Sequence, residues 1–170
     1  MNPIFFIWFG ICFICYTLRT SFHVLDNKKS NLVKSKKLPT LMSVTMFFLW
    51  FSWFPMSFFD PIKMNISLAK YFGLILFLAG FALVILSHLK IAGFVSDELI
   101  TTGIYSKIRH PMYLGFILWI VGFPIFMQSL ITLASSIIWI PQIMYWKKSE
   151  ERKLEKKYKD YKEYKKKTWF

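Results

Sequence analysis

The sequence predicts an all-α integral membrane protein with about five transmembrane helices, the last two forming a hairpin, and a cytoplasmic C-terminal helix. Of its 170 residues, 55% are hydrophobic and 20% are aromatic. The apolar residues form continuous runs instead of alternating or amphipathic patterns, which indicates lipid as the solvent. The net charge is +13, and the basic residues cluster between and after the apolar runs, where membrane proteins carry cytoplasmic charge. This placement beside the leaflet, in alternation with acids, argues against nucleic-acid binding.

Three apolar runs in the first half of the chain predict single membrane spans. They cover about Pro3 to Leu18, Leu41 to Phe59 and Leu68 to Leu89, each close to the ~20 residues that a helix needs to cross the hydrocarbon. Pro55 is expected to kink the second span near one end. The first run follows no basic segment and precedes no small-residue cleavage site, so we expect a retained span and not a signal peptide.

The apolar stretch from Tyr113 to Trp146 is too long for one crossing and predicts two short ones. Pro124, Gln128 and Ser129 lie near its middle, where a turn would reach the far interface. The expected helices of this hairpin are about 112–126 and 130–146. Four spans with one long kinked helix is the alternative.

The distribution of charge favours five spans. Basic residues are concentrated after the first span, in the 90–111 connection and in the tail from Lys147, whereas the connection after the second span is sparsely charged. Five spans place the three basic segments together, with the N-terminus outside and the tail in the cytoplasm. We expect the tail, Lys147 to Lys167, to continue as a helix out of the last span and to meet anionic lipid.

The two cysteines, Cys12 and Cys15, form a C-x-x-C inside the first apolar run. A metal shell would need a His or a further Cys nearby, and the local sequence has neither. We therefore expect two small apolar residues on one helix face, and no metal site.

The segment from Leu99 to Gly115 contains the chemically informative residues. Gly103 permits a turn and Pro111 suits the first turn of the next span. Four side chains between and just after them are polar or aromatic: Tyr105, Arg109, His110 and Tyr113. Each alone would be an ordinary interfacial anchor.

Glu150 and Glu151 strengthen the functional interpretation, because the five-span arrangement places them on the same side as this segment. Carboxylates at an anionic leaflet need a partner or a role. A cluster with both signs of charge, aromatic walls and a membrane edge suits a zwitterionic cofactor and a lipid.

The run from Gly103 to Gly115 resembles the G-x-Y-x-x-x-R-H-P-x-Y-x-G signature of the isoprenylcysteine carboxyl methyltransferase and phospholipid methyltransferase superfamily. The run from Glu150 to Leu154 resembles that superfamily's E-E-x-x-L, and an aromatic tail follows with Tyr158, Tyr161 and Tyr164. The resemblance covers about residues 91–167. We accordingly divide the chain into N-terminal transmembrane helices, 1–90, and a methyltransferase core with the cytoplasmic tail, 91–170.

The resemblance implies methyl transfer from S-adenosylmethionine at the cytoplasmic face to a membrane-embedded or lipophilic acceptor that arrives through the bilayer. An isoprenylcysteine-like carboxylate, a phospholipid amine and a small apolar thiol or phenol are all open as acceptors. The residues that correspond to the family's cofactor-binding positions are Leu99, Ile100, Tyr105, His110, Pro111, Met112, Tyr113 and Glu150.

The chemistry of these residues suits that cofactor. Glu150 can pair with its ammonium, and Tyr105 or Tyr113 can face its sulfonium. A strand followed by G-x-G-x-x-G is missing, so the Rossmann mode of binding does not apply. Arg109 is the candidate for orienting an anionic acceptor or the cofactor carboxylate, and Glu151 is a candidate base or a helix-end partner for Arg109.

One departure from the pattern concerns the acceptor. Prenylcysteine enzymes have an Arg four residues before the first Glu of the pair, and this chain has Trp146 there, which argues against a prenylcysteine acceptor. Two other functions stay open. NADPH-dependent sterol and steroid reductases have a related R-H-P-N-Y-x-G-E signature, but Met112 and Phe116 differ from it. A non-catalytic membrane anchor or adaptor is the other alternative.

Overall fold

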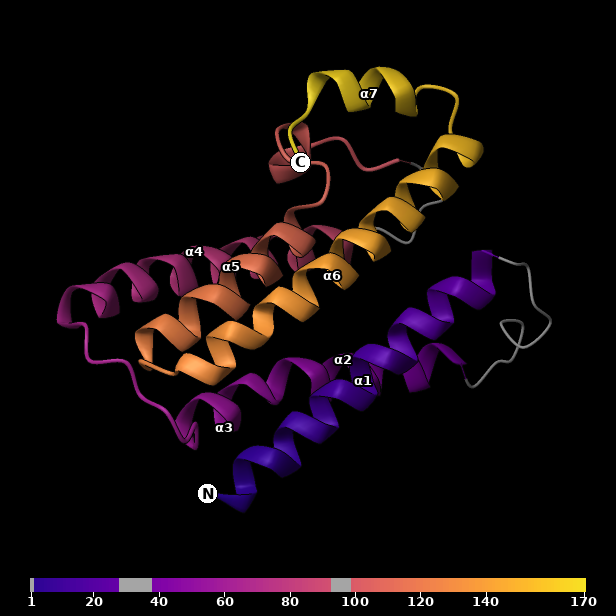
Figure 1. The fold of residues 1–170 in the computed structure, drawn as a ribbon. Coiled ribbons are helices and arrows are strands. Elements are labelled where there is room, and N and C mark those ends of the chain that lie inside the picture. Colours follow the sequence, from indigo (N-terminus) through magenta and orange to yellow (C-terminus); the bar gives the residue numbers. More distant parts are fainter. Residues whose placement is uncertain (1, 28–37, 93–98) are drawn as a thin grey trace.

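The computed structural model describes residues 2–27, 38–92 and 99–170 (Figure 1). Within these ranges the chain forms helices and no strand, so the predicted all-α class is confirmed. The helices are α1 (Pro3–Asn27), α2 (Leu38–Phe51), α3 (Trp53–Phe58), α4 (Ser67–Ala92), the short 3-10 helix η2 (Gly103–Ser106), α5 (Pro111–Phe126), α6 (Leu130–Lys157) and α7 (Tyr161–Lys167). Most of the basic connection after the first span, residues 28–37, lies outside the described residues.

In the described part of the chain, three segments are long and apolar enough to cross a membrane: Pro3–Leu25, Thr40–Phe58 and Ser67–Lys90. The apolar helix α5 is shorter, with 16 residues, and α6 begins apolar and ends highly charged over 28 residues. Large apolar side chains on these helices face outward, including Ile7, Phe47 and Leu89. Such an apolar exterior is what a lipid solvent requires.

The second span is broken one turn before Pro55. Helix α2 ends at Phe51 and α3 begins at Trp53. Pro55 has no N–H to donate to the Phe51 carbonyl, which weakens the helix at this point. The Ser52 hydroxyl donates to the Phe48 carbonyl at the break. The helix is thus interrupted at Ser52, and the expected kink at Pro55 stays a prediction.

The α5–α6 hairpin turns at residues 127–129, as the sequence predicts. Gln128 adopts a left-handed backbone with φ of 56°, and its Oε1 accepts a hydrogen bond of 2.8 Å from the Ile66 amide. The Asp60 carboxylate accepts bonds of 2.7 Å from both the amide and the hydroxyl of Thr132. Asp60 thus caps the first turn of α6 from a distant part of the chain.

Glycines bring α4 and α5 into close contact. Gly80 faces Gly115, and Gly73 faces Gly122, one pair seven residues from the other on each helix. A Cβ on Gly115 would lie 2.7 Å from the Gly80 carbonyl oxygen, closer than real Cβ atoms come. This packing fixes α5 on α4 and, with it, the segment that precedes α5.

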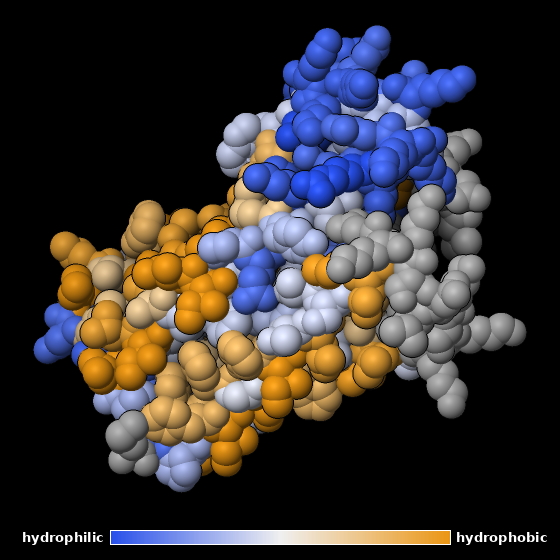
Figure 2. All heavy atoms as spheres, turned by 45° about the vertical axis from the view of Figure 1, so that its right-hand side comes forward, coloured by the Kyte–Doolittle hydropathy of each residue, from blue (hydrophilic) through white to orange (hydrophobic). Residues whose placement is uncertain are grey.

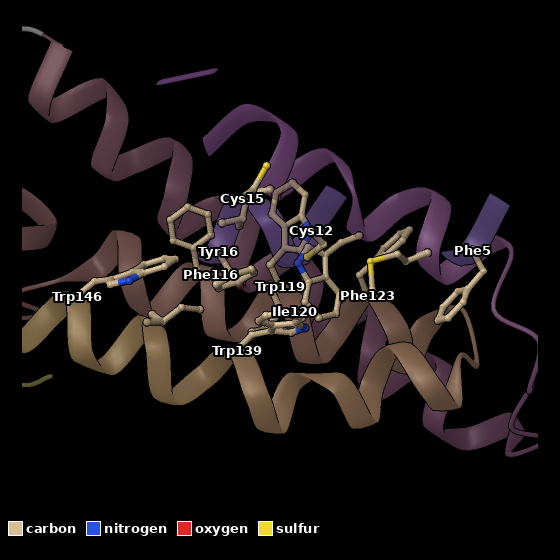
Figure 3. Packing of buried hydrophobic residues seen from close by; sticks show 14 residues of the cluster. Phe5, Cys12, Cys15, Tyr16, Phe116, Trp119, Ile120, Phe123, Trp139 and Trp146 are labelled. Atoms are coloured by element: carbon tan, nitrogen blue, oxygen red, sulfur yellow. The ribbon is translucent and has the colours of Figure 1, made fainter. Parts of the chain in front are cut away.

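Aromatic side chains from α1, α5 and α6 form the core (Figure 3). The Tyr16 ring stacks on Trp139 and Trp146 of α6, with ring centroids 4.4 and 5.3 Å apart. Cys12 and Cys15 are free thiols buried in this cluster. Among the described residues, no group of three or more His, Cys, Asp or Glu side chains could hold a metal ion.

The prediction of one continuous tail helix is wrong beyond Lys157. The backbone of Tyr158 is extended, with φ of −119° and ψ of 120°, and α7 begins at Tyr161 after a short turn. This turn folds α7 back over η2 and the residues that follow it (Figure 1), where the Tyr164 hydroxyl donates a 2.6 Å bond to the Tyr105 carbonyl. Such long-range contacts stabilise the break.

Candidate active site

A polar cavity of about 300 Å³ lies at the charged end of the helical bundle. Figure 2 shows hydrophilic side chains gathered over this end and apolar side chains over much of the remaining face. The cavity is formed by α1, the segment from Leu99 to His110, the start of α5, the charged part of α6, and α7. Its lining comprises Arg19, Leu99, Ile100, Tyr105, Arg109, His110, Met112, Tyr113, Glu150, Leu154, Tyr158, Tyr161 and Tyr164.

The predicted cofactor-binding residues converge on this cavity. All of them except Pro111 line it, although Glu150 is far from the others in sequence. Pro111 is instead fully buried as the first residue of α5. A proline suits that position because its missing N–H would have no helical partner.

Glu150, Tyr113 and Arg19 form a connected polar group within the cavity wall. The Tyr113 hydroxyl interacts with both the Glu150 carboxylate and the Arg19 guanidinium. Burial raises the pKa of Glu150, while the hydrogen bond from Tyr113 and the charge of Arg19 oppose this rise. The Arg19 Nε is buried and has no hydrogen-bond partner among the described residues. Arg19 therefore points inward, although it lies in a membrane span.

Glu151 points away from the cavity into a cluster of basic side chains. One carboxylate oxygen lies 3.4 Å from Arg109 Nε, 3.5 Å from His110 Nε2 and 4.0 Å from Lys147 Nζ. The other lies 3.1 Å from Lys165 Nζ. Burial works against ionisation, but the hydrogen bond and charge of Lys165, with the other cations, lower the pKa of Glu151. Of the two roles predicted for Glu151, this geometry favours the helix-end partner over the base.

Arg109 joins the end of the chain to the segment before α5. Its Nη1 donates to the Lys165 carbonyl at 2.9 Å and also to the Thr168 carbonyl. The Arg109 amide donates to the Trp169 carbonyl at 3.0 Å. Arg109 lines the cavity, but much of its hydrogen-bonding capacity holds the C-terminal segment in place.

His110 is a buried residue of the cavity lining and lies between α6 and α7. Its Nε2 lies 3.4 Å from the Tyr161 hydroxyl. Burial lowers the pKa of His110 to about 4, although the nearby Glu151 carboxylate opposes this. The imidazole is consequently neutral at physiological pH, and its contact with Glu151 is not an ion pair.

Comparison with known families identifies the chain. A model of the phospholipid methyltransferase family matches residues 68–161, more than half of the chain. The chain belongs to this family. Membership implies an integral membrane methyltransferase that acts on lipids, and it favours methyl transfer over the reductase alternative. No curated protein and no solved structure significantly matches the chain.

The family match also differs in extent from the resemblance seen in the sequence. The family match begins at residue 68, the second residue of α4. The resemblance in the sequence begins only at about residue 91. The match thus includes Gly73 and Gly80, the residues that hold this family member's α4 against α5. The division into 1–90 and 91–170 remains a prediction.

Trp146 does not face the cavity of this methyltransferase. It is 1% exposed, stacks on Tyr16 and donates a 3.0 Å bond from Nε1 to the Thr20 hydroxyl.

Sequence reasoning missed Arg19 as a cavity residue, because an Arg after an apolar run is typical of ordinary cytoplasmic charge. The tyrosines at 158, 161 and 164 carried a signal in their spacing of three residues, but they had no assigned role.

Proposed function

We propose that the protein transfers a methyl group from S-adenosylmethionine to a lipid at the polar cavity. The observation that supports this most strongly is the convergence of the predicted cofactor-binding residues on one cavity, where Glu150 is the single carboxylate among the described lining residues. The family supplies methyl transfer and a lipid acceptor. The cofactor, the cytoplasmic location and the entry of the acceptor from the bilayer are parts of the proposal.

The chemistry of the cavity suits S-adenosylmethionine. This cofactor carries an ammonium, a carboxylate and an activated methyl group on a sulfonium. Glu150 would hold the ammonium through a charge-assisted hydrogen bond. The aromatic faces of Tyr105 and Tyr113 would lie against the cationic sulfur. Burial raises the pKa of Tyr105, so this phenol stays neutral.

The surrounding residues would act by positioning. Methyl transfer depends heavily on alignment and on the placement of charge. Glu151 and Arg109 bind one another and fasten the C-terminal segment over the cavity. Neutral His110 contacts Tyr161 of α7. We assign these three as positioning residues, and Glu150, Tyr105 and Tyr113 as residues that touch the cofactor.

The basic tail would hold the cavity at the inner leaflet. Exposed lysines of α7, including Lys162, Lys166 and Lys167, extend from the charged end of the bundle. Each basic residue near an anionic surface contributes about 1 kcal/mol of attraction. We propose that anionic lipid binds this helix and that the N-terminus lies outside.

Binding of S-adenosylmethionine to the detergent-purified protein tests the cofactor assignment. We expect saturable binding by calorimetry, weakened at least tenfold in Glu150→Gln because the ammonium loses its counter-charge. Glu163→Gln is the matched control, since Glu163 is exposed on α7, and it should bind like the unaltered protein. Absence of binding by the unaltered protein, or binding of NADPH instead, would contradict the proposal.

A further inference from the structure

A second hollow, here called the apolar groove, lies beside the polar cavity and has a volume of about 850 Å³. It is formed by α1, α2, α4 and α5, and its walls include Met42, Met46, Trp50, Phe81, Val84 and Ile85. Phe81 and Ile85 are 42% and 40% exposed, so the groove opens on the outer face of the bundle. Hollows of this size and polarity bind small apolar molecules or chains.

The groove meets the polar cavity at two residues, Arg19 and Met112, which line both. The hydrophilic residues of the groove lining are Arg19 from α1, Ser43 from α2 and His88 from α4. All its other lining residues are apolar. An amphiphile in the groove would therefore meet the Arg19 side chain where the groove reaches the cavity.

Arg19 supplies a cation at this junction. A charged residue within a span normally extends its head toward the interface, but the buried Nε and the contact with the Tyr113 hydroxyl show an inward orientation. A guanidinium can bind a phosphate through two parallel hydrogen bonds. Ionisable residues that face inward within a span are typical of functional sites.

We propose that the apolar groove binds the acyl chains of a glycerophospholipid and that Arg19 binds its phosphate. Binding in this manner would place the headgroup at the polar cavity, and only that consequence rests on the proposed function. Arg19 is then the residue that selects a phosphate-bearing lipid over an uncharged one. It lies outside residues 68–161, the part of the chain that matches the family.

Lipid binding to the purified, delipidated protein tests this without any methyl transfer. The probes are dioleoylphosphatidylethanolamine and dioleoylglycerol, which share acyl chains and differ in the phosphate headgroup, counted by native mass spectrometry. We expect Arg19→Gln to weaken phosphatidylethanolamine binding by on the order of tenfold, the usual effect of losing a charge-assisted bond. Binding of dioleoylglycerol should not change. Arg19→Lys should retain part of the preference.

Arg152→Gln is the matched control, because Arg152 is exposed on α6, and it should leave both lipids unaffected. An equal loss in Arg152→Gln would overturn the proposal, since surface charge alone would then explain the preference. Ile85→Trp tests the apolar wall of the groove, and it should weaken the binding of both lipids several-fold. Its neighbour Leu86 is 50% exposed, and Leu86→Trp should have no effect.

Cofactor binding separates the two proposals. S-adenosylmethionine affinity is measured in Arg19→Gln beside the lipid preference, because Arg19 also contacts Tyr113 in the wall of the polar cavity. Loss of cofactor binding with an unchanged lipid preference would overturn this inference and assign Arg19 to the cofactor carboxylate. Lipid selectivity that depends on Arg19, in a protein that binds no S-adenosylmethionine, would contradict the proposed function while supporting the phosphate site.

Discussion

The Glu151 carboxylate neutralises several basic side chains at once, and its removal should destabilise the charged end of the bundle. Without it, Arg109, Lys147 and Lys165 would repel one another in a partly buried site. We expect Glu151→Gln to lower the free energy of unfolding by about 2–3 kcal/mol, near the lower end for a broken buried ion pair. Glu155→Gln is the control, because Glu155 pairs with the half-exposed Lys165 and should cost less than about 1 kcal/mol. Thermal unfolding in detergent measures the stability of both variants. Equal losses of stability in the two variants would contradict the role given to Glu151.

His110 should make stability depend on pH. Burial lowers its pKa to about 4 in the folded protein, whereas an unfolded histidine titrates near ~6.5. Between these values the unfolded chain binds more protons, so stability falls as the pH falls from about 6.5 to 4, by up to about 3 kcal/mol. His110→Asn should flatten this part of the stability profile, measured by chemical unfolding at several pH values. An unchanged slope in the variant would show that other groups cause it.

At the scale of single residues, the sequence predicted the cavity lining well where a motif carried the information. Tyr105, His110 and Tyr113 came from one short run, and Glu150 from a second. Arg19 was not predictable in this way, because only the packing of α1 against the other helices brings it to Glu150 of α6 and Tyr113 of α5. The difference between Glu150 and Glu151 also required the structure, since adjacent helical residues point in different directions.

Helices α4 and α5 depend on their facing glycines. A methyl group on Gly115 would meet the Gly80 carbonyl and Val84 Cγ2 at 2.7 and 2.8 Å, so the helices would have to separate. We expect Gly115→Ala to cost about 1–3 kcal/mol, as overpacking does, and to weaken cofactor binding because Tyr113 lies half a turn away. Gly10→Ala is the control, since a Cβ there has open space, and it should be neutral or stabilising. A loss of stability without any change in cofactor binding would show that α5 does not set the cavity.

At the scale of elements, the hairpin and the spans were predictable because polar residues bound each apolar run. The residues at which the helices end were less predictable. Helix α1 continues to Asn27 and not to Leu18, since helical hydrogen bonding does not stop where apolar residues stop. The turn at Tyr158 was also missed, because it depends on distant partners such as Arg109 and Tyr105, which the tail sequence itself does not contain.

At the scale of the whole molecule, opposite ends of the bundle differ in chemistry. One end has α7 and the cluster around Glu151, with basic residues in excess. The segment between α3 and α4 at the other end is held by Asp60 and Gln128 and has few charges. The positive-inside rule therefore predicts that the first end faces the cytoplasm.

Labelling of single cysteines in intact cells tests this orientation. The native thiols are buried, and a background with Cys12→Ala and Cys15→Ala removes any remaining reaction of these thiols with the label. Asn65 and Lys162 are both exposed and lie in the α3–α4 connection and in α7. We expect Asn65→Cys to react with a membrane-impermeant maleimide from outside, and Lys162→Cys to react only after permeabilisation. The reverse pattern would place the polar cavity on the external face, and labelling of both from outside would favour four spans, because an even number of crossings brings the tail to the side of the N-terminus.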